Sequence, residues 1–502
     1  MYDVIVIGAG VNGLSAGLNL AASGLRTLIL DRSGRAGGQA VTHEPLLPGF
    51  LVHPHANYLS YRDLHALQPD PASRVVAARA VRPVAQHGLA FRDGGPPVVL
   101  HRRDHQDRTR RSLARHSVRD ARTYARCKKI ADQLTPALSA LFFSSPRAES
   151  FAGDLAEVAR AFDGVVDPKL LGSRSARALI DELFEADAVR TLFYLLFAEF
   201  SGDLEEPGGD VGVLGYVFWL LGRRELPLGG MGAVPDALAR AAAAAGAEIR
   251  LDAEVARVVV ERGAVRGVRL RDGSLLRAPM VASSIGYDVH LRELMEPADL
   301  SAAERTALAR FEKANAGLIG SYAACLTQPP RYASGAHDAD IDACAQTFVG
   351  LDNTGEVLDH FRGLRSGELP APCGPVRVNT LWDPGQAPAG HHVAGADCAF
   401  PDGLDDAYLS GVGRSYPAAF TRMWKQYAPG VEDSVLAQHI SLSREVNRTM
   451  SLREGDGQYR GHARGLYFCG SSTHPGGGVH GACGVNAYRV MTADRSAGVA
   501  TA

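Results

Sequence analysis

The glycine pattern near the start of the chain constrains its fold more than any other feature. Residues 4–7 are a short apolar run of the kind that builds a buried parallel strand. Gly8, Gly10 and Gly13 follow as G-x-G-x-x-G and open a stretch with helical spacing. In such a turn the first glycine permits a tight bend, the second lets a pyrophosphate approach, and the third lets helix and strand pack closely. The pattern predicts a strand–turn–helix unit that binds a dinucleotide at the helix N-terminus.

An acidic residue and a second glycine group strengthen this prediction. A second apolar run, residues 27–30, ends at Asp31, eighteen residues after Gly13. A carboxylate at about this distance binds the ribose hydroxyls of a dinucleotide. The pair Gly37-Gly38 follows a few residues later. An ordinary glycine turn needs none of these additions, so we expect a dinucleotide site.

The extended pattern over residues 2–38 resembles the N-terminus of flavoproteins that bind FAD on a Rossmann-type domain. The resemblance is to the branch that includes amine oxidases and carotenoid desaturases, which the extra glycine pair separates from plain NAD dehydrogenases. In that family the loop passes close to the cofactor pyrophosphate and the flavin. The resemblance therefore implies FAD as the cofactor.

A second block, residues 229–284, has the order expected of the same family. A glycine turn leads into an alanine-rich helix, a strand, an alternating hairpin over 255–270 and a buried strand at 281–284. In the family this block completes the cofactor domain after a first substrate-domain segment. The residue that matches Val255 there contacts the adenine through its backbone.

The third block, residues 465–491, is the most specific. A strand at 466–469 leads into a glycine loop at 470–478, and a helix begins near Gly481–Gly484. The stretch 473–478 closely resembles the signature of carotenoid desaturases and phytoene-desaturase-like relatives. Glycine costs conformational entropy, so this density is typical of backbone that lies against a flat ring. The helix N-terminus would then favour a reduced, anionic flavin.

These three blocks predict an α/β protein with a Rossmann-type FAD-binding domain and an interleaved α+β substrate domain of mixed sheet plus helices. We expect the FAD-binding domain to comprise residues 1–65, 225–290 and 455–502, and the substrate-binding domain residues 66–224 and 291–454. The residues expected to bind the cofactor are Gly8, Gly10, Gly13, Asp31, Arg32, Gly37, Gly38, Val255, Gly470, Gly477, Gly478 and Val479.

A flavin desaturase must lose a proton as well as a hydride, which requires a proton acceptor. His480 follows the glycine triplet at a position that is usually small or apolar in the family, and a neutral imidazole there could act as the base. The alternative is a loop histidine bonded to a backbone carbonyl. His55 and Tyr58 are further candidates, because in the family this segment runs alongside the flavin. They could equally belong to a polar strand with satisfied hydrogen bonds.

We expect an FAD-dependent oxidoreductase of the phytoene desaturase-like type that acts as a desaturase or dehydrogenase on a small, apolar or specialised metabolite. An amine or amino-acid oxidase that produces hydrogen peroxide is one alternative. Such oxidases usually keep a lysine beside the flavin, expected on the strand at 319–326, where this chain has Gly320 and Ser321 and where Lys313 lies upstream. A redox-neutral flavin isomerase is another alternative. The Rab escort and GDP-dissociation-inhibitor architecture without flavin is disfavoured by the intact glycine patterns.

Composition limits the partners. The formal net charge of -2 supplies no basic field for nucleic acid. Seven scattered cysteines without C-x-x-C argue against a disulfide framework or zinc site and for a reducing, cytoplasmic compartment. The histidines between residues 43 and 65 lie in too extended a stretch for one metal ion, so no metal site is expected. The longest apolar stretch, residues 211–221, is too short for stable membrane insertion.

A basic run raises the question of peripheral contacts. Residues 101–129 hold eleven Lys or Arg against three Asp, and Ser117 with Asp120 predicts a helix start within the run. A solvated helix face is the simpler interpretation, and docking to anionic lipid heads or an acidic carrier protein is the alternative. Apolar helices at 117–143, 177–200 and 211–221 are expected to cover an apolar pocket over the flavin. The oligomeric state stays open.

Overall fold

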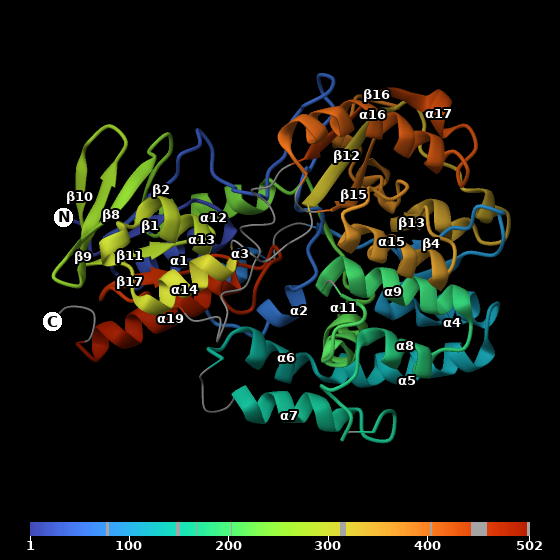
Figure 1. The fold of residues 1–502 in the computed structure, drawn as a ribbon, viewed down its shortest axis with the longest axis horizontal. Coiled ribbons are helices and arrows are strands. Elements are labelled where there is room, and N and C mark those ends of the chain that lie inside the picture. Colours follow the sequence, from blue (N-terminus) through green and yellow to red (C-terminus); the bar gives the residue numbers. More distant parts are fainter. Residues whose placement is uncertain are drawn as a thin grey trace.

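The chain folds into two lobes joined by several crossing segments (Figure 1). The computed structural model describes residues 1–76, 80–146, 151–167, 169–201, 203–311, 318–401, 404–442 and 459–498. One lobe is built on a parallel sheet and holds the chain's N-terminus, and the other is built on a larger mixed sheet.

The parallel sheet has five strands in the order β17-β11-β1-β2-β7. Ile5 in the central strand lies opposite Val281 on one side and Leu28 on the other. These strands come from three distant parts of the chain: β1 (Val4–Ile7), β2 (Thr27–Leu30), β7 (Glu248–Arg250), β11 (Met280–Ser283) and β17 (Leu466–Phe468). All five match strands expected from the sequence.

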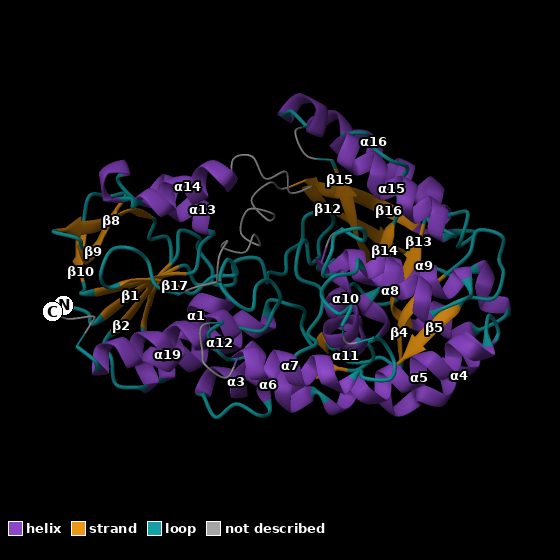
Figure 2. Cartoon of the chain, turned by 60° about the horizontal axis from the view of Figure 1, so that its bottom comes forward, coloured by secondary structure: helices purple, strands orange, loops and turns teal. Residues whose placement is uncertain are grey.

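Both faces of the parallel sheet are covered, as its continuous apolar runs require (Figure 2). Val4 and Val6 pack in the core that includes the helices, whereas Ile5 and Ile7 pack with a three-stranded antiparallel sheet. The covering elements are α1 (Val11–Ala22), α12 (Ala233–Ala244) and α19 (Ala482–Ser496) on one face, and β8 (Val255–Glu261), β9 (Ala264–Leu270), β10 (Leu275–Arg277), α13 (Tyr287–Val289) and α14 (Ala302–Phe311) on the other. This is the expected Rossmann-type architecture.

The second lobe contains a seven-stranded sheet in the order β16-β12-β15-β14-β13-β4-β5. Its neighbouring strands run antiparallel except for the parallel pair of β13 and β4, so the sheet is mixed, as predicted. The strands are β4 (Ala85–Leu89), β5 (Val98–His101), β12 (Leu318–Leu326), β13 (Cys344–Val349), β14 (Gly374–Arg377), β15 (His392–Phe400) and β16 (Val435–Leu442).

Helices cover both sides of this sheet. Helix α16 (Asp406–Trp424) and α17 (Val431–Ser434) lie on one side, and the larger helical layer lies on the other (Figure 1). That layer comprises α4 (Gln106–Ala114), α5 (Val118–Gln133), α6 (Thr135–Phe142), α7 (Phe151–Ala161), α8 (Ala176–Leu183), α9 (Asp187–Ser201), α10 (Gly209–Val211), the π-helix η2 (Gly212–Val217), α11 (Phe218–Leu220) and α15 (Thr354–Ser366).

Two helix boundaries show what the sequence could and could not predict. Ser117 caps α5 as expected, because its hydroxyl accepts a hydrogen bond from the Asp120 amide at 3.1 Å. The single helix expected over 117–143 is instead two helices. Pro136 lies in the first turn of α6, where a missing N–H costs nothing, and the break falls at Leu134.

The aromatic side chains of the helical layer pack mainly on one another. Phe193 lies 4.6 Å from Phe184 and 5.2 Å from Phe218 between ring centroids, and Tyr124 closes the group. All four are buried. These residues therefore form core, and an apolar pocket over the flavin stays a prediction.

Ion pairs to a buried carboxylate lie at the junction between the lobes. Glu225 accepts a hydrogen bond from Arg62 at 2.7 Å and another from Arg82, and its backbone pairs with Leu59. Short strands β3 (Ala80–Val81) and β6 (Leu226–Pro227) pair beside it, and α2 (Arg62–His65) follows the first crossing.

The expected domain bounds stay predictions. Helix α3 (Pro71–Val76) contacts α1 and α12, although the expected bound at residue 65 assigns it to the other domain. The expected bound between residues 454 and 455 lies outside the described residues.

Candidate active site

The N-terminal glycines form a tight turn between β1 and α1. Gly8 has a φ of +96°, a conformation that other residues rarely adopt. A Cβ on Gly13 would lie 2.0 Å from the Gly8 carbonyl oxygen and 2.8 Å from the Ser284 hydroxyl. A Cβ on Gly10 would meet nothing closer than the Gly38 Cα at 3.8 Å. Gly13 thus serves close packing, whereas a Cβ on Gly10 would make only an ordinary van der Waals contact.

The second glycine pair packs directly on the first turn. The Gly37 amide donates to the Ala9 carbonyl at 2.9 Å, and a Cβ on Gly38 would approach the Gly10 Cα to 3.2 Å. Both have positive φ values, +139° and +59°. The two glycine segments, distant in sequence, therefore line one face of the same cradle.

Asp31 stands at the end of β2 and is already part of the turn. Its carboxylate accepts hydrogen bonds from the Ala9 amide at 2.6 Å and the Ser33 amide at 2.8 Å. Since a carboxylate offers about four lone-pair sites, it can still accept from a ribose hydroxyl. Its carbonyl accepts from the Ala253 amide at 2.8 Å, which brings Val255 at the start of β8 close by. Arg32 beside it is exposed.

The cradle fits the cofactor that the sequence implies. Gly10 is the N-cap residue of α1 and tolerates a close approach, and there the amide groups and the helix dipole favour an anion such as a pyrophosphate. The Asn12 side-chain oxygen is buried without a hydrogen-bond partner in the described part of the chain. A hydroxyl of a bound nucleotide could donate to this oxygen. Sequence reasoning had not singled out Asn12.

The C-terminal glycine loop lies between β17 and α19, against the same cradle. A Cβ on Gly470 would lie 2.4 Å from the Ser284 carbonyl oxygen, and one on Gly484 would lie 2.0 Å from the Asn12 carbonyl oxygen. Gly478 has a φ of +121°, and a Cβ there would approach the Tyr61 hydroxyl to 3.1 Å. Gly477 and Val479 flank Gly478 in this loop. The loop thus connects the cofactor lobe with the segment that leads to the other lobe.

His480 is fully buried, and both of its ring nitrogens contact backbone. Nδ1 accepts from the Ala482 amide at 3.0 Å, and Nε2 donates to the Gly477 carbonyl at 3.2 Å. Burial, together with the charge of the nearby His65, lowers the pKa of His480 to about 3. The direction is the one expected from the sequence, although burial and not the helix dipole is the main cause. The ring also makes edge contacts with Tyr61 and Phe142.

The two histidines of segment 53–58 lie in different environments. His53 is buried and bonded to Gln386 at 2.8 Å. His55 is partly exposed, and its ring donates to the Pro54 carbonyl. Burial lowers the pKa of His55 below 6.5, and the charge of Asp397 opposes this effect. His55 is therefore a neutral imidazole beside a carboxylate.

Tyr58 belongs to a buried network that the sequence did not reveal. Its hydroxyl donates to Glu199 at 3.0 Å, and the Arg224 guanidinium lies 3.6 Å from its ring centroid. Arg224 binds both oxygens of Glu199 at 3.0 Å, and Gln346 donates to Glu199 at 2.8 Å. Burial raises the pKa of Tyr58 well above its usual value. These residues lie far apart in sequence and on different elements, so periodicity carried no signal for them.

A second ion pair adjoins this network. Arg377 donates two parallel hydrogen bonds to Asp397, at 2.8 and 3.0 Å, and Asn57 donates to the same carboxylate at 3.3 Å. Tyr61 and Tyr216 share a hydrogen bond of 2.5 Å between their hydroxyls, beside the glycine loop. Segment 55–61 thus brings polar groups of the second lobe to the edge of the cofactor cradle.

The basic run is largely neutralised within the protein. Arg102 pairs with Asp104, Arg103 with Asp63, Arg108 with Asp340, Arg110 with Asp107, Arg115 with Asp338, Arg119 with Glu185 and Lys128 with Asp132. These pairs agree with the simpler interpretation of the basic run, a solvated helix face. Lys313 lies outside the described residues.

Neither a metal site nor a membrane-spanning helix is found in the described part of the chain. No group of three or more His, Cys, Asp or Glu side chains is placed to hold a metal ion in that part of the chain. No described helix is long and apolar enough to cross a membrane.

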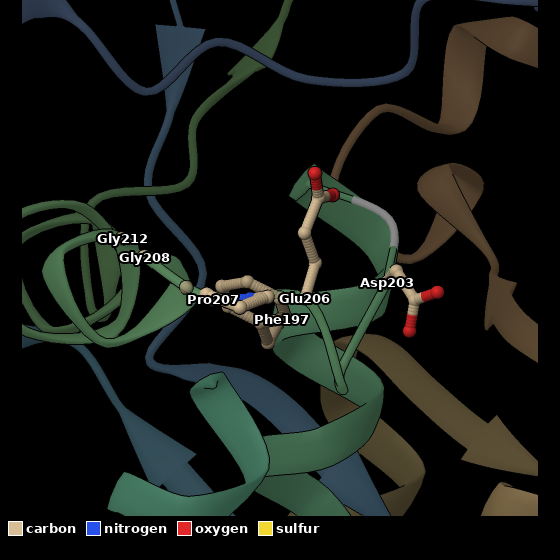
Figure 3. A pocket seen from close by; sticks show the side chains of 7 residues that line it. Phe197, Asp203, Glu206, Pro207, Gly208 and Gly212 are labelled. Atoms are coloured by element: carbon tan, nitrogen blue, oxygen red, sulfur yellow. The ribbon is translucent and has the colours of Figure 1, made fainter. Parts of the chain in front are cut away.

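A separate hollow of about 220 Å³ lies beside the C-terminal end of α9 (Figure 3). It is lined by Phe197, Asp203, Glu206, Pro207, Gly208, Gly209 and Gly212. None of these residues belongs to the predicted site, and the carboxylates of Asp203 and Glu206 point away from the Phe197 ring.

A Rossmann-type sheet with a glycine cradle and a C-terminal glycine loop defines a class of flavoprotein. Residues 12–317 match the family of flavin containing amine oxidoreductases. The chain belongs to this family and is an FAD-dependent oxidoreductase. The match confirms the family resemblance found in the sequence.

Curated relatives extend over the whole chain. Pyridine nucleotide-disulfide oxidoreductase domain-containing protein 2 of Mus musculus is 26% identical over 98% of this chain and 94% of its own. A limonene dehydrogenase subunit from Castellaniella defragrans is 25% identical over 98% of this chain and 94% of its own. Hydroxyneurosporene desaturase of Rhodobacter capsulatus is 25% identical over 98% of both chains. Among solved structures, an oxidoreductase from Methanosarcina mazei shares the fold with a TM-score of 0.63 at 17% identity, covering 97% of this chain and 99% of its own.

Proposed function

We propose that this oxidoreductase is a dehydrogenase of the desaturase type. It removes a hydride and a proton from a small specialised metabolite bound between the two lobes. The names of two relatives, a limonene dehydrogenase and a hydroxyneurosporene desaturase, describe removal of hydrogen from such compounds. The FAD-binding domain (1–65, 225–290 and 455–502) holds the cofactor, and the remaining segments hold the substrate.

The observation that carries this proposal is strand β12. It runs from Leu318 to Leu326 without a lysine and has Gly320 and Ser321 where the amine-oxidase lysine is expected. Gly320 is also tightly packed, since a Cβ there would lie 2.5 Å from the Phe400 ring. The strand therefore favours a dehydrogenase over an amine oxidase.

FAD, when bound, accepts the hydride. The glycine residues of the cradle approach its pyrophosphate, and Asp31 binds its ribose. Arg32 and the Val255 backbone lie at the adenosine end, and the backbone of Gly470, Gly477, Gly478 and Val479 lies along the flavin. These roles are supported by the shared cradle and by the helix N-termini that face it.

His55 is the proton acceptor in this proposal, at the ring nitrogen that does not donate to Pro54. The support is its neutral, partly exposed ring beside the Asp397 carboxylate, which would stabilise the imidazolium. Tyr58, oriented by Glu199, positions substrate beside it. His480 holds the glycine loop against α19, because its two nitrogens bond the backbone on both sides.

A substrate panel tests the proposal. Purified enzyme is mixed without oxygen with terpenes, their alcohols and primary amines, and the visible flavin absorbance is recorded. We expect bleaching by a compound that loses hydrogen from a C–H bond next to carbon. Bleaching by amines alone, with hydrogen peroxide on re-oxidation, would assign the chain to the oxidases instead.

A further inference from the structure

Two arginine–carboxylate pairs stand side by side next to segment 55–58. Arg377 binds Asp397 through two hydrogen bonds, and Arg224 binds Glu199 through two more. The pairs interact, since the charge of Glu199 helps to raise the pKa of Arg377. They therefore form one polar surface at the edge of the cofactor cradle.

In both pairs the carboxylate is more exposed than the arginine. The Asp397 side chain is 28% exposed against 3% for Arg377, and the Glu199 side chain is 13% exposed against 2% for Arg224. The arginines thus lie behind their partners. The surface presented to a substrate is one of hydrogen-bond acceptors and not of cations.

The two carboxylates differ in the number of further hydrogen bonds that they can accept. Both oxygens of Glu199 are occupied by Tyr58, Arg224 and Gln346. For Asp397, Oδ2 accepts from Arg377 and Asn57, whereas Oδ1 accepts from Arg377 alone among the described hydrogen bonds. Since each carboxylate oxygen has two lone pairs, Asp397 Oδ1 can accept one more hydrogen bond.

We propose that Asp397 binds a hydrogen-bond donor of the substrate, a hydroxyl or an ammonium group. This inference rests on the proposed function and specifies its substrate class. A pure hydrocarbon would strip water from the exposed carboxylate and return no hydrogen bond, which disfavours binding. A donor on Asp397 would place the adjoining C–H bond near His55, because the Asn57 side chain donates to both the Asp397 carboxylate and the His55 carbonyl.

Binding can be measured without turnover. Oxidised holoenzyme is titrated with 1-octanol, octylamine and octane, and the change in the visible flavin spectrum gives each dissociation constant. We expect octanol or octylamine to bind about ten- to hundred-fold more tightly than octane, and the preferred one identifies the donor as hydroxyl or ammonium. Equal binding of all three, or binding of none, would overturn the proposal.

Variants assign the effect to Asp397. Asp397→Asn should abolish the preference over octane, whereas Asp340→Asn should keep it. Asp340 is a matched control, with a 22% exposed side chain paired to Arg108 and His101 in the same lobe. If Asp397→Asn alone fails to fold, the double variant R377Q/D397N removes both charges of the pair, so that the buried Arg377 guanidinium is not left without its partner. An unchanged preference in Asp397→Asn would overturn the proposal, and loss of FAD from this variant would show instead that Asp397 serves the cofactor and would overturn it too.

The two proposals fail in different ways. If octanol or octylamine binds more tightly than octane, but no compound of the substrate panel bleaches the flavin, the result would count against the dehydrogenase function. Bleaching by a hydrocarbon, with no preference for donors, would count against the role of Asp397 alone.

Discussion

The Nδ1 atom of His480 accepts a hydrogen bond from the Ala482 amide at 3.0 Å, at the first turn of α19. The N-cap position of α19 is Gly481, which has a φ of +68° and no side chain that could cap the helix. His480 therefore acts as the cap of this helix and at the same time holds Gly477.

His480→Ala should lower stability by about 1 kcal/mol, as loss of a helix cap does, and weaken FAD binding. His480→Asn, which keeps an acceptor, should recover part of both. Thermal unfolding, flavin content and single-turnover flavin reduction measure these effects. If His480→Asn keeps its stability and flavin but reduces flavin about 10²–10⁴-fold more slowly, the residue is the base after all.

The pH dependence of flavin reduction separates the three candidate bases. A base must be deprotonated, so the rate should rise with pH and level off above the pKa of the group. Burial lowers the pKa of His55 below 6.5, which places the acid limb below that pH. For His480, with a pKa of about 3, the limb would lie far lower, and for Tyr58 it would lie above pH 10.

Stopped-flow reduction between pH 5 and pH 9, within the stable range, measures the profile. His55→Gln should remove the acid limb and slow reduction by about 10²–10⁴-fold. His53→Gln is the control, because His53 is buried and bonded to Gln386. An unchanged profile in His55→Gln would refute its assignment.

Two glycines of one motif should respond differently to alanine. Gly13→Ala would place a Cβ 2.0 Å from the Gly8 carbonyl oxygen and should destabilise the whole FAD-binding domain. Gly10→Ala has room, with its nearest neighbour at 3.8 Å, so the apoprotein should fold normally but bind FAD weakly. Circular dichroism and FAD titration report the two effects separately. Tight FAD binding by Gly10→Ala would show that the pyrophosphate lies elsewhere.

Buried neutral histidines should make the fold sensitive to acid. Burial lowers the pKa of His290 to about 3, against about 6.5 in the unfolded chain. The unfolded state therefore binds a proton below pH 6.5 that the folded state excludes. The stabilisation is complete above pH 6.5 and is lost progressively as the pH falls towards 3.

For one such histidine the loss between pH 6.5 and pH 5 is about 1.6 kcal/mol. Denaturant unfolding at the two pH values measures it. His290→Gln, which cannot titrate, should show a smaller decrease than the wild type. An equal decrease in both proteins would mean that His290 does not contribute.

The cofactor half of the molecule was predictable because its signals are local. The strand, glycine turn and helix at residues 4–22 lie within one short segment, and β17 with α19 repeats that order at the other end. The hairpin of β8 and β9 was equally predictable from the alternation of apolar and polar residues along its strands. In each case the periodicity and the glycines report the same structure.

The substrate half was predictable only in outline. The Tyr58–Glu199 bond joins residues separated by 141 positions, and Asn57–Asp397 by 340. No periodicity links such partners, since each pair forms only when two distant elements pack. The aromatic side chains of the helical layer pack on one another, and whether these helices also cover the flavin stays a prediction, because burial in a core and burial around a ligand select the same residues.

The most direct test of the central claim follows the substrate and the flavin together. Enzyme and the best compound from the panel are mixed without oxygen, and flavin bleaching is measured alongside the mass of the product. The proposed dehydrogenase should bleach one flavin per molecule of product, and the product should lack two hydrogen atoms. A product of unchanged mass, formed while the flavin stays oxidised, would contradict this account and indicate an isomerase.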